Sequence, residues 1–167
     1  MKTITIIFAL LSYTCHCQNN WVSIELTGMV TVEFPAIPEA INSTLNRIVD
    51  STGYYMTLHS EHSGIGDFQS NKKDLNTYYT SFVKKFIDNS GGLLINKSSF
   101  KVNGYKGVEF IIDLIGPDSQ NFRFISRAFL VEETMYSIIC YTLPEHWKSD
   151  STRRKRFLNS VKLSSRR

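Results

Sequence analysis

Cysteine is scarce in this chain: three are present, and two of them, Cys15 and Cys17, lie close to the start. Cys140 alone remains, inside an apolar run typical of a strand. One cysteine cannot form an internal disulfide, and an unpaired thiol in such a run is more often a small core residue than a nucleophile. We therefore expect Cys140 to be a packing residue in the core.

The common catalytic and nucleotide-binding motifs are also missing. The sequence has no Walker loop, dinucleotide fingerprint, EF-hand loop or Gly-x-Ser-x-Gly elbow. Histidine is rare, and one short stretch holds the residues that could ligate a metal: on a continuing strand His59 and Glu61 share a face, with His62 near the next loop. We expect no catalytic residues and no cofactor. A small metal-dependent enzyme using His59, Glu61 and His62 is the alternative.

The first segment predicts export. Residues 4–11 form an apolar run that is far too short to cross a bilayer and follows a charged start. This pattern predicts a signal peptide over residues 1–17, with Cys15 and Cys17 at the −3 and −1 positions of the cleavage site. The alternative is lipidation at Cys15, because residues 11–15 resemble a lipobox. In both cases we expect a periplasmic, secreted or lipid-anchored protein.

Composition predicts one globular domain over residues 18–167, since 42% of the residues are apolar and 20% are charged. The net charge of +4 is mild, but basic residues crowd the C-terminus. Arg153, Arg154, Lys155 and Arg156 form a basic patch, for which a solvated helix face is the plain interpretation. The functional interpretation is weak, salt-sensitive contact with an anionic membrane or an acidic partner.

Period-two alternation predicts strands in both halves of the chain. Residues 21–26 and 30–34 read as one hairpin, and residues 45–49 and 54–58 as a second one. Residues 61–73 have no period and predict a loop. Four longer runs, 93–102, 105–115, 122–131 and 135–143, are joined by short turns and so predict an antiparallel meander. Its last strand is apolar on both faces, which implies layers above and below the sheet.

Two helices complete the predicted fold. Asp74 is expected to cap the first helix, whose apolar residues recur at helical spacing: Leu75, Tyr78, Tyr79, Phe82, Val83, Phe86 and Ile87. The second helix is expected to start near Ser149 or Asp150 and to end near Ser160. It should turn Phe157, Leu158 and Val161 inward and residues 153–156 outward. The fold class is therefore α+β, an antiparallel sheet flanked by helices in an α/β/α sandwich.

Four short segments resemble the Mog/PsbP-like superfamily in their order along the chain: residues 30–35 with Pro38, 104–110, 127–131 with Tyr136, and 156–161. The resemblance covers nearly all of the chain after residue 17. It implies an antiparallel sheet flanked by helices and a role in binding, and it brings no shared catalytic motif. The chain departs from the usual pattern at Val161, where an aromatic is common, and at residues 132–134, which lack a glycine.

The sequence thus predicts a non-catalytic binding or adaptor domain outside the cytoplasm, with a protein or small ligand of the cell envelope as its partner. Nucleic acid is not expected. The aromatic and basic residues of Phe122-Arg123-Phe124 alternate as the two faces of a strand do.

Overall fold

The structure is a computed structural model that describes residues 21–61, 72–116 and 119–164. The predicted signal peptide, Cys15 and His62 lie outside these ranges, so what was expected of them stays a prediction. In the described parts of the chain, no helix is both long enough and apolar enough to cross a membrane.

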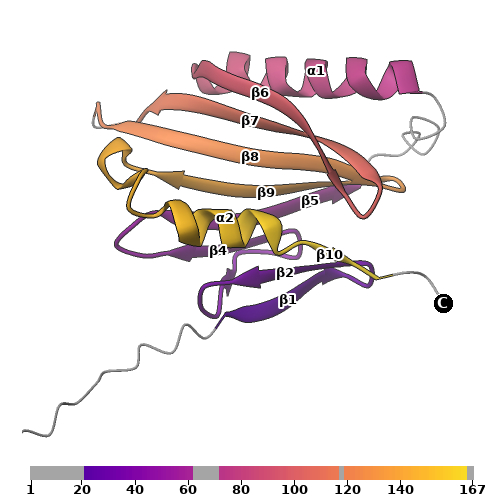
Figure 1. Ribbon diagram of the computed structural model, residues 1–167, viewed down its shortest axis with the longest axis horizontal. Coiled ribbons are helices and arrows are strands. Elements are labelled where there is room, and N and C mark those ends of the chain that lie inside the picture. The colour runs from indigo at the N-terminus through magenta and orange to yellow at the C-terminus, as the bar shows by residue number, and fades with distance from the viewer. Residues whose placement is uncertain (1–20, 62–71, 117–118, 165–167) are drawn as a thin grey trace, which may run out of the picture.

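A seven-stranded antiparallel sheet forms the centre of the molecule (Figure 1). Its order is β3-β4-β5-β9-β8-β7-β6, so the four strands after residue 92 lie side by side as a meander and the β4–β5 hairpin joins them through β9. Both predictions are confirmed. The strands are β3 (Glu39–Ala40), β4 (Leu45–Val49), β5 (Tyr54–Glu61), β6 (Leu93–Val102), β7 (Tyr105–Ile115), β8 (Asn121–Val131) and β9 (Thr134–Thr142).

The first hairpin builds a separate sheet. β1 (Val22–Thr27) pairs with β2 (Val30–Phe34), as the alternation predicts, and β10 (Lys162–Leu163) adds to the other edge of β2. Neither β10 nor β3 was expected from the sequence. Each has two residues, and a period of two needs a longer run to be visible.

Helix α1 (Lys72–Ser90) covers one face of the large sheet (Figure 1). Its predicted apolar stripe is confirmed: Leu75, Tyr79 and Val83 are buried against Val108, Phe110 and Ile112 of β7. The expected cap at Asp74 is wrong, because the helix already includes Lys72 and Asp74 therefore lies in its first turn. The remaining stripe residues are partly buried against the same cluster: Tyr78, Phe82, Phe86 and Ile87.

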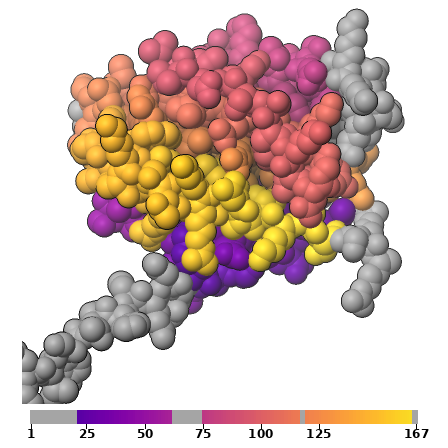
Figure 2. Space-filling view, in the orientation of Figure 1, coloured from indigo at the N-terminus to yellow at the C-terminus, as the bar shows by residue number. Residues whose placement is uncertain are grey.

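The opposite face of the large sheet carries helix α2 (Ser151–Asn159), the 3-10 turn η2 (Pro144–His146) and the small sheet (Figures 1 and 2). Phe157 is fully buried between Phe34 of β2 and Tyr55 of β5, with ring centroids 5.1 and 5.4 Å away. Leu158 and Val161 are buried as predicted. The two apolar layers, one on each face, confirm the α+β sandwich.

Alternation along β8 follows from this arrangement. Phe124 faces α1, while Arg123 and Arg127 face the side of α2. Cys140 of β9 is buried in the second layer, as expected of a packing residue, and desolvation raises the pKa of its thiol well above 9.0.

Candidate functional site

The histidine region lies at the end of β5, next to β9. The His59 ring stacks on Tyr136 of β9 at a centroid distance of 6.0 Å, and its Nδ1 atom is buried. Glu61 is the last residue of the strand and is exposed. No three His, Cys, Asp or Glu side chains within residues 21–61, 72–116 and 119–164 lie close enough together to hold a metal ion. Because His62 is outside these ranges, the predicted trio stays a prediction.

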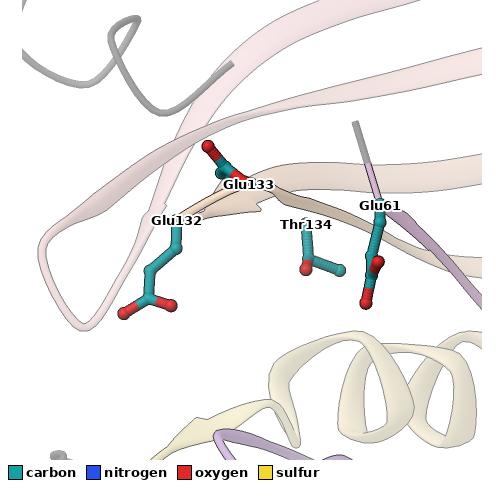
Figure 3. A pocket seen from close by; sticks show the side chains of 4 residues that line it. All are labelled: Glu61, Glu132, Glu133 and Thr134. Atoms are coloured by element: carbon teal, nitrogen blue, oxygen red, sulfur yellow. The ribbon is translucent and has the colours of Figure 1, made fainter. Parts of the chain in front are cut away.

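A hollow of about 570 Å³ lies beside Glu61, lined also by Glu132, Glu133 and Thr134 (Figure 3). The last three residues belong to the β8–β9 turn and the start of β9. Glu132 occupies the left-handed region with φ 54°, at a turn where the sequence has no glycine. Figure 3 shows that the Glu133 side chain points to the opposite side from those of Glu132 and Glu61. Glu133 therefore points away from the other two carboxylates, and the three do not form a common cation site.

Most residues of the predicted basic patch are engaged in ion pairs. Arg153 binds Asp50 of the β4–β5 turn at 2.7 Å, and Arg156 lies 3.3 Å from Glu33 of β2. Lys162 also binds Glu33, at 2.9 Å. Hydrogen bonding to Lys162 is the largest cause of the lowered pKa of Glu33; desolvation opposes it, and Arg156 adds to the lowering.

Arg154 corrects the expectation that residues 153–156 all face outward. It is only 6% exposed, and its guanidinium lies 3.6 Å from the centroid of the Trp147 ring. Its Nη2 donates to the Trp147 carbonyl at 2.9 Å, and its Nη1 lies 3.9 Å from Oδ2 of buried Asp150. Arg154 lies three residues before Phe157 and four before Leu158, so helical spacing places it on the same buried face, and here the inward position carries a charge.

Asp150 connects this helix to the large sheet. It is the N-cap of α2 but makes no capping hydrogen bond with its side chain. Instead its Oδ1 accepts a hydrogen bond of 2.7 Å from the Tyr55 hydroxyl. Desolvation, followed by this bond, raises the pKa of Tyr55, and desolvation lowers the pKa of Arg154. These charged groups hold α2 against the sheet.

A shallow polar pocket of about 420 Å³ remains at the start of α2. Trp21, Arg153 and Arg156 line it together with hydroxyl-bearing residues of the helix start and of the β4–β5 turn. The Arg156 guanidinium lies 4.3 Å from the centroid of the Trp21 ring. Both arginines are already paired with acids, so the pocket has little uncompensated charge.

Two further arginines form ion pairs on the surface of the large sheet. Arg123 makes a bidentate pair with Asp113 at 2.7 and 2.8 Å, and Arg127 binds Glu109 at 2.7 Å. The hydrogen bond from Arg123 is the largest cause that lowers the pKa of Asp113 below 3.8. These pairs join neighbouring strands β7 and β8, a structural role.

The groove between α1 and β6 was not expected from the sequence. It measures about 260 Å³ and is lined by Val83 and Ile87 of the helix and by Leu94 and Lys97 of the strand, among others. The only sequence signal is the run Leu93-Leu94-Ile95, which is apolar without alternation, whereas the strand is polar from Asn96 to Ser99. Such a run at a sheet edge leaves apolar side chains exposed.

Comparison with known proteins supports the fold alone. No protein-family model matches the sequence, and no curated protein matches it. Among solved structures, cyanobacterial PsbP (CyanoP) from Synechocystis sp. PCC 6803 is similar with a TM-score of 0.58 and 13% identity, over 81% of this chain and 86% of that one. The Ran-binding protein Mog1p of Saccharomyces cerevisiae has a TM-score of 0.55 and 10% identity, over 86% and 95%.

A third similar structure is PA94 of Pseudomonas aeruginosa, described as a protein of unknown function and putative regulator. Its TM-score is 0.53 and its identity 12%, over 88% of this chain and 98% of that one. Three proteins of different origin thus share the overall fold of this chain. The chain has the Mog/PsbP-like fold that its sequence segments resemble.

Proposed function

We propose that the protein is an extracytoplasmic, non-catalytic binding or adaptor domain. The main support is that the charged side chains near α2 bind one another and so join elements of the fold. Near α2, the arginines, aspartates and Glu33 form pairs that join α2, β2 and the β4–β5 turn, so they stabilise the fold. The one described thiol, Cys140, is buried.

The fold comparisons agree with a binding role. Mog1p is named as a Ran-binding protein, and PA94 as a putative regulator. The apolar run at residues 4–11 supports a location outside the cytoplasm.

The test is affinity capture from the envelope fraction of the cells that make the protein. The full-length chain is the bait, and an unrelated exported protein of similar size and charge is the control bait. We expect one envelope component to be enriched reproducibly by this chain. Repeated captures with no enriched component would contradict the binding role.

The alternative, a metal-dependent enzyme using His59, Glu61 and His62, has a separate test. Elemental analysis of the purified protein would have to find zinc, copper or iron at about one ion per chain for this alternative to stand. We expect none, because the spacing of the three residues is less committed than that of known catalytic zinc sites.

A further inference from the structure

Strand β6 is a long, exposed edge of the large sheet. Among the described residues it pairs on one side only, with β7. At its start the side chains of Leu93, Leu94 and Ile95 are 67%, 41% and 46% exposed, and Ile115 at the end of β7 is 75% exposed. A strand with one free edge offers unpaired amide and carbonyl groups to another extended chain, and exposed apolar side chains add to that tendency.

The groove between α1 and β6 lies directly beside this edge. Buried Val83 and half-buried Ile87 form its apolar floor on the helix side, and Leu94 forms the wall on the strand side. Figure 1 shows that α1 lies beside β6, the edge strand that directly follows it in the chain. A chain added to β6 would place every second side chain toward α1, and one apolar side chain fits this groove.

The charge along this edge is positive. Lys97 points to the helix, where its Nζ donates to Thr80 at 3.2 Å, and Lys101 lies further along the same strand. Lys84 at the groove is already paired with Asp88 at 2.5 Å. The acids of the neighbouring strand β7, Glu109 and Asp113, are bound by arginines of β8. Among the described residues neither Lys97 nor Lys101 has an acidic partner, so this edge favours an acidic segment.

The same lysines argue against a second copy of this chain as the occupant. Two antiparallel β6 strands would bring Lys97 and Lys101 of both copies close together, and like charges facing each other destabilise a pair of strands.

We propose that β6 binds an extended, acidic and apolar segment of a partner protein as an added strand, with one apolar side chain in the α1–β6 groove. This inference depends on the proposed binding function and names the kind of partner and its docking surface.

The experiment is a selection of random dodecapeptides, displayed on phage, against the immobilised full-length protein, followed by calorimetric titration of the selected peptides. We expect peptides with apolar residues at alternate positions and a net negative charge. Leu94→Lys should weaken their binding by at least about tenfold, the effect of losing one central contact. Ile41→Lys is the matched control, because Ile41 is also 41% exposed but lies near the opposite edge of the sheet.

A charge reversal at Lys97 gives a second test, because a switch in peptide preference cannot result from a loss of folding. Lys97→Glu should weaken the acidic peptides and strengthen variants of them in which lysine replaces the acids. The docking surface is overturned if no peptide is selected, if Leu94→Lys binds as well as Ile41→Lys, or if sedimentation shows a wild-type dimer that Leu94→Lys dissociates. An envelope component captured equally by wild type and Leu94→Lys would keep the binding function and overturn this surface.

Discussion

At the scale of single residues, charge is placed where it joins elements that are distant in the sequence. Arg154 and Asp150 are both buried and connect α2 to Trp147 and to Tyr55. Arg153 and Arg156, by contrast, are partly exposed and bind acids near the surface. The three arginines of the basic patch are therefore expected to differ in their importance for stability.

We predict that Arg154→Ala lowers the free energy of unfolding by about 3 kcal/mol, because it leaves the buried carboxylate of Asp150 without its compensating cation. Arg153→Ala should cost less than about 1 kcal/mol, as is usual for partly exposed pairs. Urea unfolding followed by circular dichroism measures both values. Equal losses for the two variants would show that Arg154 is not the residue that matters.

The Arg123–Asp113 pair predicts a pH dependence. The folded-state pKa of Asp113 lies below 3.8, so its contribution is fully present above the unfolded-state pKa and is lost as pH falls through the folded-state value. Since the pair is about a third exposed, the contribution is below about 1 kcal/mol. The difference in unfolding free energy between wild type and Arg123→Gln should therefore shrink between about pH 5 and pH 2.

Asp113→Asn serves as the control for this titration. It should show the same flattened profile as Arg123→Gln. A difference between wild type and Arg123→Gln that stays constant over this pH range would contradict the assignment.

Part of this arrangement of side chains could be predicted from the sequence. Helical spacing predicted Phe157 and Leu158 as core residues, and the basic cluster was visible directly. Its acidic partners, Glu33 and Asp50, are about a hundred residues away in the chain, and nothing local indicates that the fold brings them to α2. The burial of Arg154 was missed for a different reason: it lies three residues before Phe157 and four before Leu158, so helical spacing places it on the buried face, but its charge favoured the solvent side.

At the scale of elements, α1 is fixed to the sheet by one hydroxyl as well as by its apolar stripe. The Tyr79 hydroxyl donates to the Lys106 carbonyl of β7 at 2.7 Å and accepts from the Leu130 amide of β8 at 3.0 Å. This places the helix across two neighbouring strands. Desolvation raises the pKa of Tyr79 to about 12.

We predict that Tyr79→Phe lowers the free energy of unfolding by about 1–2 kcal/mol at neutral pH, because two buried backbone groups lose a partner. At high pH the difference should shrink. The raised folded-state pKa gives wild type a contribution that is fully present below about pH 10 and is lost as pH rises toward about 12. Chemical unfolding at pH 7 and pH 11 tests this, and equal losses at the two pH values would contradict it.

Long elements were predictable and short ones were not. The α1 stripe and the strands of the meander extend over enough residues for their period to appear. Strands β3 and β10 have two residues each, and they exist because a longer neighbour offers its edge. The groove at β6 could not be predicted either, since it depends on how far α1 lies from the sheet edge.

At the scale of the whole molecule, the basic end of the chain predicts only weak membrane contact. With Arg153, Arg154 and Arg156 engaged in pairs, little of the patch is free to meet an anionic surface. We expect the protein to sediment weakly with phosphatidylglycerol vesicles at low salt and not at high salt, because salt screens exposed charges. Sedimentation that does not change with salt would contradict an electrostatic contact.

We infer that this protein binds a partner and performs no chemistry on it. One quantitative capture from envelope extracts, with wild type, Leu94→Lys and Ile41→Lys as parallel baits, tests it most directly. We predict a single component that wild type and Ile41→Lys retain equally, that Leu94→Lys loses by about tenfold, and whose mass is unchanged after incubation with the protein. A component that is cleaved or modified during incubation, or no component at all, would contradict the claim.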